Sequence, residues 1–266
     1  MAKCVDRSGR PGLASSNAVI SRTIKGIVFD VGETLLCFGP LDTRSLFNEA
    51  ARRSYDYLRG LGVDVGSFRR YYWKSLIGLR WHLLRTFLTG RDFDALDLLQ
   101  EVGQKKGLHL TEDQWRQVHW CWYEPLYNVT QVEPDLQDTI RMLAGRYKLG
   151  ILSNTFVHAS AIERHLGELG VLDYFPVRLW SYDFAFRKPD RRIFIEAAQR
   201  LGEPPHALVY VGDRIDKDVK GALAAGMIPV LKQAHTNGRG APPAGTVRIE
   251  RLAELPDRLR EIESRT

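Results

Sequence analysis

The sequence is poor in cysteine and has no long apolar run, and both absences narrow the kind of protein it can be. Only three of its 266 residues are cysteine, and no two of them form a Cys-x-x-Cys pair. This argues against a disulfide framework or a zinc site, and it fits a reducing compartment. No apolar stretch reaches the roughly 20 residues that a membrane-spanning helix needs. We therefore expect a cytoplasmic protein without a membrane partner.

The first 22 residues lack the continuous apolar segment of a signal peptide. They are rich in Ser, Gly and Arg and contain a single acidic residue, Asp6. An organelle-targeting segment would share this composition, but such segments form amphipathic helices, and no amphipathic pattern is evident here. We therefore predict that residues 1–22 form a flexible tail.

The sequence also has fewer acidic than basic residues, which gives a formal net charge of +6 and a pI of about 9.3. The basic residues are spread along the whole chain and are mixed with acids, so they mark no separate nucleic-acid-binding segment. A basic surface around a site for an anionic substrate explains the charge equally well. We expect no nucleic-acid partner.

The distribution of apolar residues divides the chain into an alternating part and a helical insert. Residues 23–30 form a β-branched apolar run, which predicts a buried strand ending in Asp30. Residues 41–127 contain no such run and show helical periodicity instead. Strand-like and helix-like segments then alternate to the end of the chain. This pattern predicts an α/β fold with a parallel sheet and helices on both of its faces.

The helical insert carries local signals for the ends of its helices. Ser67 can cap a helix that ends before Gly90, and another helix is expected to begin near Asp94. Thr111 and Gln114 have the spacing of a capping box at the start of a further helix. The insert is therefore expected to contain only helices and their connections.

Aromatic residues in the insert are interleaved with arginines. Such a set can form a pocket that stacks on a ring or base of a substrate, or it can form the core of a helical bundle with its arginines in water. We favour the bundle core. The aromatic residues concerned are Tyr71, Tyr72, Trp73, Trp81, Trp115, Trp120 and Trp122.

Polar residues stand at the carboxyl ends of the predicted strands, where open parallel sheets bind their ligands. Asp30, Ser153 and Asp213 end three of these strands, and Lys188 lies in a loop. Carboxylates such as Asp30 and Asp213 are the ligands that Mg²⁺ prefers, whereas Ser153 and Lys188 can neutralise phosphate oxygens. A carboxylate that attacks phosphorus gives a covalent intermediate and divides one difficult step into two. The pattern therefore predicts a metal-assisted phosphoryl-transfer site.

Four segments resemble, in order, the motifs of the haloacid dehalogenase superfamily of hydrolases. They are FDVGETL at 29–35, LSNT at 152–155, RKPDRRIF at 187–194 and VGDRIDKDVKGALAAGM at 211–227. The fourth segment is the most specific, because an acid pair with this Gly-Ala-Gly spacing rarely arises by chance. The resemblance implies a Rossmann-like catalytic core made of residues 23–40 and 128–266, with a helical-bundle cap at 41–127.

The resemblance also assigns roles to the residues at the matching positions. Asp30 is the expected nucleophile, and Mg²⁺ is the expected cofactor, bound by Asp30 and Asp213. Asp218 is expected to orient the metal's ligands or Lys188, and Asn154 is expected beside the substrate. The residues expected to hold the phosphoryl group are Thr34, Ser153 and Lys188.

One position departs from the phosphatases of this superfamily. They usually carry a second aspartate two residues after the nucleophile, followed by a glycine, whereas this chain has Gly32 and Glu33 there. General acid–base catalysis contributes about 10²–10⁴ in rate, so losing it predicts a slow enzyme or one limited to good leaving groups. Glu33 is either a substitute acid at the substrate or a turn residue, and we favour the turn residue. Gly32 also lies beside the expected substrate and can still offer its backbone carbonyl to Mg²⁺.

Three functions fit these residues. The favoured one is a Mg²⁺-dependent phosphatase that acts on a small phosphorylated metabolite through an aspartyl-phosphate intermediate. The superfamily also contains metal-independent 2-haloacid dehalogenases, but these generally replace the Gly-Asp pair that stands here at Gly212 and Asp213. The third is a non-catalytic binding protein with the same fold. The sequence is compatible with a monomer or a homodimer.

Overall fold

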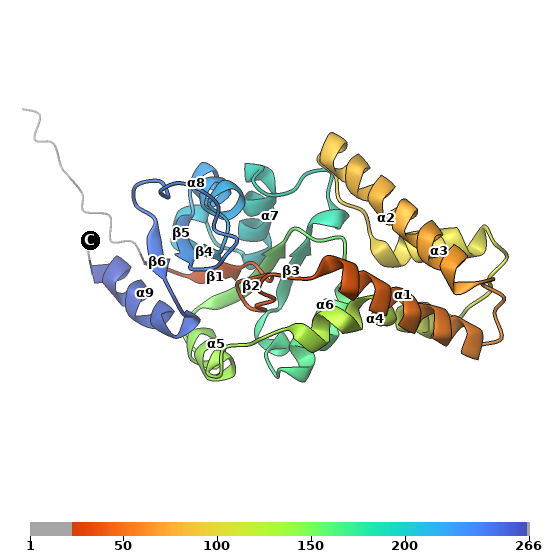
Figure 1. The fold of residues 1–266 in the computed structure, drawn as a ribbon. Helices are drawn as coiled ribbons and strands as arrows, with labels where there is room; N and C mark the ends of the chain where they lie inside the picture. Colours follow the sequence, from red (N-terminus) through yellow and green to blue (C-terminus); the bar gives the residue numbers. More distant parts are fainter. Residues whose placement is uncertain (1–22, 265–266) are drawn as a thin grey trace, which may run out of the picture.

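A six-stranded parallel sheet lies at the centre of the part of the protein outside the helical insert (Figure 1). The computed structural model describes residues 23–264, so the tail predicted for residues 1–22 lies outside the described residues. The strands follow the order β3-β2-β1-β4-β5-β6, and each neighbouring pair is parallel. This confirms the predicted parallel sheet. The strands are β1 (Gly26–Phe29), β2 (Lys148–Ser153), β3 (Val177–Trp180), β4 (Leu208–Gly212), β5 (Ile228–Lys232) and β6 (Val247–Ile249).

The first strand, β1, lies between β2 and β4 and is buried along its whole length. Gly26 begins it because β2 passes very close: a Cβ atom on Gly26 would lie 2.8 Å from the carbonyl oxygen of Lys148. From β1 the chain continues to β2 and β3 on one side of the sheet and later to β4, β5 and β6 on the other. The order thus reverses between β1 and β4. Such a switch point is where doubly wound sheets bind their ligands, at the carboxyl ends of the strands.

Helices cover both faces of the sheet, as the alternating pattern predicted (Figure 1). Successive residues of β1 point to opposite faces, so Ile27 and Phe29 join one apolar cluster and Val28 joins the other. The first cluster also contains buried residues of α5, α6 and α9, and the second contains those of α7 and α8. These helices are α5 (Leu136–Ala144), α6 (Ala159–Glu168), α7 (Arg191–Leu201), α8 (Lys220–Ala225) and α9 (Leu255–Ser264).

Four helices form the insert between β1 and α5, and they extend to one side of the sheet (Figure 1). Their caps are those that the sequence predicts: Ser67 and Asp94 accept hydrogen bonds from the first turns of their helices, and Thr111 and Gln114 form a capping box. No helix within residues 23–264 is long and apolar enough to cross a membrane. The helices are α1 (Thr43–Gly60), α2 (Phe68–Thr89), α3 (Ala95–Gln104) and α4 (Glu112–Val129).

Two elements of the core differ from the sequence analysis. The edge strand β3 was not predicted, because its four residues Val-Arg-Leu-Trp are too short and too mixed to show a strand pattern. The second difference lies at residues 216–225, whose sequence pattern predicts one helix, whereas the structure has a π-helical turn, Ile215–Val219, before α8. Such wide turns inside helices are frequent at functional sites, and this one carries Asp218.

The aromatic residues of the insert do not all form a bundle core. Trp115 is buried at 5% exposure in a cluster made by the insert's own helices, as we predicted. Trp120 is equally buried, but it belongs to the apolar cluster on one face of the sheet. Trp73 and Trp81 in α2 are instead 50% and 65% exposed, so for these two side chains the prediction of a core position was wrong. The physical reason is that α2 contacts α1 through the side that carries Tyr71 and Tyr72, whereas Trp73 and Trp81 lie on other parts of its surface.

Candidate active site

Three acidic side chains meet at the carboxyl edge of the central strands. Asp30 directly follows β1 and Asp213 directly follows β4, while Asp218 lies on the π-helical turn after β4. One carboxylate oxygen of each residue lies within 4.8 Å of those of the other two. All three residues are buried, with exposures of 8%, 2% and 1%. The structure therefore brings together the three residues that the sequence analysis proposed as metal ligands or their supports.

Lys188 inserts its ammonium group among these acids. Its Nζ atom lies 2.9 Å from Asp30 Oδ1 and 2.7 Å from Asp218 Oδ1, and it donates a 2.9 Å hydrogen bond to the hydroxyl of Tyr210. Burial by itself lowers the pKa of Lys188, but the charges of Asp218 and Asp30 outweigh burial and raise it above its ordinary value. Lys188 is therefore a fixed positive charge directly beside Asp30.

Asn154 holds the backbone of Lys188 in place. Its side-chain oxygen accepts a 2.9 Å hydrogen bond from Lys188 N, and its Nδ2 donates a 2.9 Å bond to Lys188 O. Because both ends of the amide group are occupied, the geometry gives Asn154 a positioning role. A contact between Asn154 and the substrate stays a prediction.

Asp213 is held by the loop that follows β5. The hydroxyl of Thr236 donates to Asp213 Oδ2, and Asn237 Nδ2 donates a 2.6 Å hydrogen bond to the Asp213 carbonyl oxygen. Burial, together with the charges of Asp30 and Asp218, raises the pKa of the Asp213 carboxyl to about 7, against the smaller opposing effect of the Thr236 hydrogen bond. A cation at this position would favour the charged form of Asp213.

The turn after Asp30 explains the unusual pair of residues at positions 32 and 33. Glu33 adopts a left-handed backbone with φ of 56°, whereas Gly32 is not among the described glycines with positive φ. The Glu33 carboxylate folds back and accepts hydrogen bonds from the backbone N–H groups of Phe38, at 2.9 Å, and Gly39, at 3.1 Å. Its other oxygen lies 3.4 Å from His235 Nδ1. The Glu33 carboxylate thus stabilises the turn, which supports our preference for a turn residue over a substitute acid.

Ser153 and Thr34 lie at the same edge of the sheet. Ser153 ends β2 and is 5% exposed. Thr34 is fully buried, and its hydroxyl oxygen has no hydrogen-bond partner among the described residues. Buried polar atoms are nearly always paired in folded proteins, so an unpaired one at a site is a feature of a binding or catalytic centre. Contacts of Thr34 and Ser153 with a phosphoryl group stay predictions.

The charges at this edge do not balance. Three carboxylates, those of Asp30, Asp213 and Asp218, surround one ammonium group, that of Lys188, which leaves two negative charges when all are ionised. Carboxylate oxygens are the ligand type that Mg²⁺ binds. The donor set and the excess charge therefore both fit a divalent cation.

The cap reaches the site through the connection between α2 and α3. Asp92 in this connection lies 2.6 Å from Arg187 Nη1 and accepts a hydrogen bond from Ser181 Oγ. Ser181 Oγ also accepts a 2.9 Å bond from the backbone N–H of Thr155, the residue after Asn154. The side chain of Asp92 is only 6% exposed. One cap carboxylate thus bridges the two loops that carry Asn154 and Lys188.

The sequence analysis missed several of these residues. Tyr210, whose hydroxyl donates to Leu152 O at 2.9 Å, is one residue of an apolar strand and carries no sign of its role. Asp92 is one acid in a polar connection, 89 residues from Ser181. Thr236 and Asn237 lie in the loop that follows the apolar strand β5. The same rule that identified Asp30 and Asp213 could therefore have found them.

The sequence and the fold of this chain are similar to those of known hydrolases. Residues 24–226 match the model of a family described as haloacid dehalogenase-like hydrolases. A glyceraldehyde 3-phosphate phosphatase of Methanopyrus kandleri is 28% identical over 249 residues, covering 90% of this chain and 98% of the relative. A HAD phosphatase from Thermococcus onnurineus has a similar structure, with a TM-score of 0.54 and 25% identity, covering 89% of this chain and 98% of that one.

A 2-haloacid dehalogenase from Pseudomonas syringae pv. Tomato has the same fold, with a TM-score of 0.61 and 24% identity over 90% of this chain and 99% of that one. The fold is thus common to a phosphatase and a dehalogenase, and it does not choose between their reactions. Because the family model spans well over half of the sequence, this chain belongs to the haloacid dehalogenase-like hydrolases.

Proposed function

We propose that this hydrolase is a Mg²⁺-dependent phosphatase of small phosphorylated metabolites. The observation that carries the proposal is the uncompensated acid cluster of Asp30, Asp213 and Asp218 around Lys188. A dehalogenase needs no metal ligand at Asp213, whereas a phosphatase does. The relatives named glyceraldehyde 3-phosphate phosphatase support a small phosphorylated substrate.

Asp30 acts as the nucleophile in this proposal. One of its carboxylate oxygens bonds to phosphorus while the bond from phosphorus to the substrate oxygen breaks, and the leaving oxygen keeps that electron pair. Water then attacks the phosphorus of the aspartyl-phosphate, which releases inorganic phosphate and restores the carboxylate. Lys188, 2.9 Å from Asp30, is placed to neutralise the phosphoryl oxygens during both steps.

The remaining residues of the site position these groups. Asn154 fixes the backbone of Lys188, and Tyr210 and Asp218 hold its ammonium group. Asp30, Asp213 and the backbone carbonyl of Gly32 would hold Mg²⁺, which when bound supplies positive charge toward the phosphoryl oxygens. Position 32 supplies no acid, so the leaving oxygen takes its proton from water. Substrates with acidic leaving groups are therefore expected to react fastest.

We expect turnover of an activated aryl phosphate to require Mg²⁺, because the excess negative charge at Asp30 would otherwise repel the phosphate. The measurement is nitrophenol release with added Mg²⁺ and with excess chelator. Apparent Mg²⁺ affinity should rise from about pH 6 to about pH 8, since a proton on Asp213, with its pKa of about 7, competes with the ion.

A chelator-treated enzyme that keeps its full rate would contradict the metal requirement. Chloride release from 2-chloropropionate at a rate comparable with phosphate release would instead assign the chain to the dehalogenases. A calcium-for-magnesium exchange serves as the control for non-specific effects of divalent salt, because Ca²⁺ binds oxygen ligands with a different size and coordination number.

Replacing Asp92 should weaken the connection between the cap and the site. In Asp92→Asn the charge-assisted bond to Arg187 is lost, and bonds of this kind contribute about 1.5–3 kcal/mol. We therefore expect the melting temperature to fall by about 3–10 °C. We also expect kcat/KM to fall by about tenfold, because the loops that carry Asn154 and Lys188 lose part of the bridge between them. Asp113→Asn in α4 is the matched control, because that side chain is 93% exposed. Equal kinetics for both variants would show that Asp92 does not position the site.

A further inference from the structure

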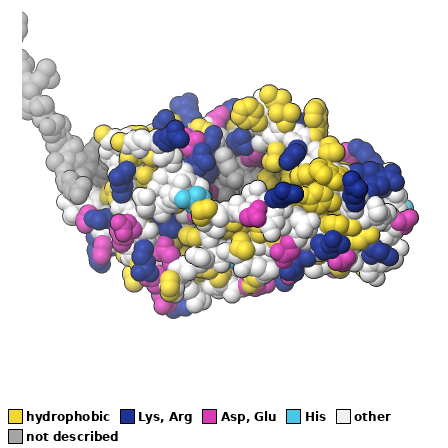
Figure 2. Space-filling model, viewed as in Figure 1, with side chains coloured by type: hydrophobic (Ala, Val, Ile, Leu, Met, Phe, Trp, Pro, Cys, Tyr) yellow, Lys and Arg dark blue, Asp and Glu magenta, His cyan; other side chains and the backbone are white. Residues whose placement is uncertain are grey.

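The outward side of α2 is an exposed apolar surface. Five of its residues, spaced by three or four positions, share one side of the helix and are each at least 48% exposed. We call them the α2 outer face: Trp73, Ile77, Trp81, Leu84 and Leu88. Leu83 and Phe87, at 40% and 78% exposure, widen it on one side. Figure 2 shows apolar side chains gathered over this part of the cap, with basic side chains among them. Apolar patches of this kind on a folded protein mark contact surfaces.

Only positive charges accompany the α2 outer face. The 22 residues of α2 include five Lys or Arg residues and no acid. By helical spacing, Arg69 and Arg80 follow one edge of the face, and Lys74 and Arg85 follow the other. Among residues 23–264, none of these four side chains, nor that of Arg70, forms an ion pair. By the same spacing Arg70, three residues before Trp73, lies in line with the face at its start. The surface is thus apolar along its middle from Trp73 onward and cationic at its start and along both edges.

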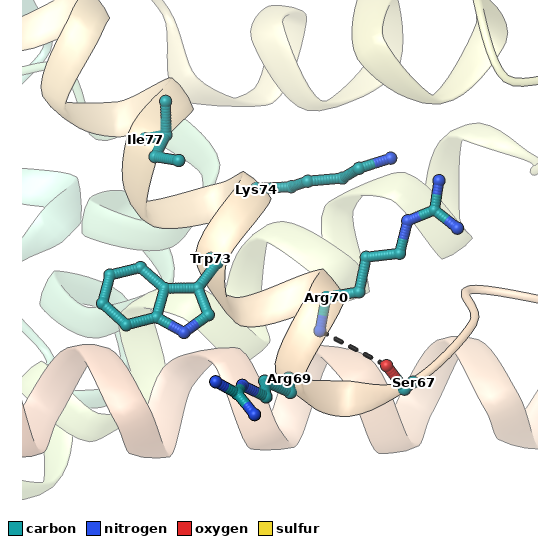
Figure 3. Close-up of a pocket in the computed structure, with 6 residues that line it drawn as sticks. All are labelled: Ser67, Arg69, Arg70, Trp73, Lys74 and Ile77. Atoms are coloured by element: carbon teal, nitrogen blue, oxygen red, sulfur yellow. Dashed lines mark hydrogen bonds between the residues drawn. The ribbon is translucent and has the colours of Figure 1, made fainter.

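The positive charge is concentrated enough to affect a neighbouring residue. Burial lowers the pKa of Lys106, and the nearby charges of Lys74 and Arg70 lower it further. At this end of α2 an open hollow of about 360 Å³ is lined by Ser67, Arg69, Arg70, Trp73, Lys74 and Ile77. Figure 3 shows the side chains of Arg70 and Lys74 extending from α2 on one side and Trp73 on the other. One tryptophan and three cationic side chains therefore surround the start of the α2 outer face.

We propose that the α2 outer face docks on an anionic lipid surface. This revises the expectation of no membrane partner, which rested on the lack of a membrane-spanning segment. A helix lying in the plane of a membrane buries an apolar strip and keeps Lys and Arg at its edges, where they meet anionic headgroups. Tryptophan is enriched at that depth, and this strip has Trp73 and Trp81. The side of α2 that carries Phe68 and Tyr71 packs on Tyr55 of α1, so the helix is already formed and needs no ordering on contact. Docking of this kind leaves every helix on the surface and crosses no membrane.

A second copy of the chain fits the same face less well. Two copies packed through α2 would bring the cations at the edges of one helix against those of the other, and α2 has no acid to pair with them. Like charges brought together across an interface are unfavourable, whereas anionic lipid complements both edges at once. Charge complementarity therefore favours an anionic lipid surface over a second copy as the partner of the α2 outer face.

The test is sedimentation of the full chain with vesicles. We expect binding to phosphatidylcholine vesicles that contain about 30 mol% phosphatidylglycerol and none to phosphatidylcholine alone. Trp81→Glu should lower the partition coefficient at least about tenfold, because it places a charge in the apolar strip. Met142→Glu is the matched control, since Met142 is 64% exposed on α5, outside this face. Both variants should keep their activity on soluble substrates.

A pair of double variants tests the charges. Arg80→Gln with Arg85→Gln should lower the partition coefficient by about 10- to 30-fold, since each basic residue near an anionic surface contributes about fivefold or slightly less. Arg239→Gln with Arg248→Gln removes the same net charge elsewhere and should change binding by less than about threefold.

Absence of binding to the anionic vesicles overturns the proposal, as does unchanged binding by Trp81→Glu. Sedimentation velocity without lipid measures the oligomeric state of the chain. A monomer is expected, whereas a concentration-dependent dimer that Trp81→Glu dissociates would assign the α2 outer face to a second copy and would also overturn the lipid proposal.

Discussion

Asp30→Asn should lower the turnover of phosphate esters by at least about 10³-fold while the fold survives, because the amide keeps the volume of the side chain but cannot attack phosphorus. Lys188 would still be paired with Asp218 at 2.7 Å, so the buried ammonium group keeps a partner. Rates on nitrophenyl phosphate and melting temperatures measure the two effects. Fluoroberyllate, which mimics an aspartyl-phosphate, should stabilise the wild type only.

Asp138→Asn on α5 is the matched control, since it makes the same chemical change at a side chain that is 78% exposed. It should leave the rate and the response to fluoroberyllate unchanged. An Asp30→Asn enzyme that keeps more than about a tenth of the wild-type rate would rule out covalent catalysis at this residue, because loss of a nucleophile costs several orders of magnitude.

Gly32→Asp should raise the rate on alkyl phosphates by about 10²-fold, because it supplies the general acid that the family usually has at this position. The site accepts the side chain: an added Cβ would have one neighbour within 4 Å, Phe38 Cε2 at an ordinary 3.5 Å. The left-handed residue of the turn is Glu33, so an aspartate at position 32 meets no backbone strain. Nitrophenyl phosphate, whose leaving group needs no proton, should react at nearly the wild-type rate.

Glu33→Gln is the control for the neighbouring position. Its amide oxygen can still accept from Phe38 and Gly39, so both kinds of substrate should respond equally and slightly. A selective loss with alkyl phosphates would instead make Glu33 the acid. A steep loss with both substrates in Gly32→Asp would show that the added carboxylate disturbs Asp30 or the metal ligands.

The placement of Asp30 and Asp213 could be predicted because it depends on one general property of parallel sheets. Their carboxyl ends meet at a single edge, so a polar residue at the end of an apolar run can be located without coordinates. Helix starts such as Ser67 and Thr111 could be predicted equally well, since a capping side chain bonds to the backbone only two or three residues away. The short edge strand β3 could not be predicted, because it forms by pairing with β2, a neighbour distant in sequence.

The sequence by itself determined the order of the elements, the acids at the strand ends and the vacant acid position at Gly32, because each depends on neighbours along the chain. Only the tertiary structure decided that Tyr210 holds Lys188 and that Asp92 reaches Arg187, since these contacts join residues 22 and 95 positions apart. It also decided that Trp115 is buried and Trp81 exposed. A side chain's exposure depends on which surface its helix packs against, and two tryptophans on apolar helices look alike until that packing is known.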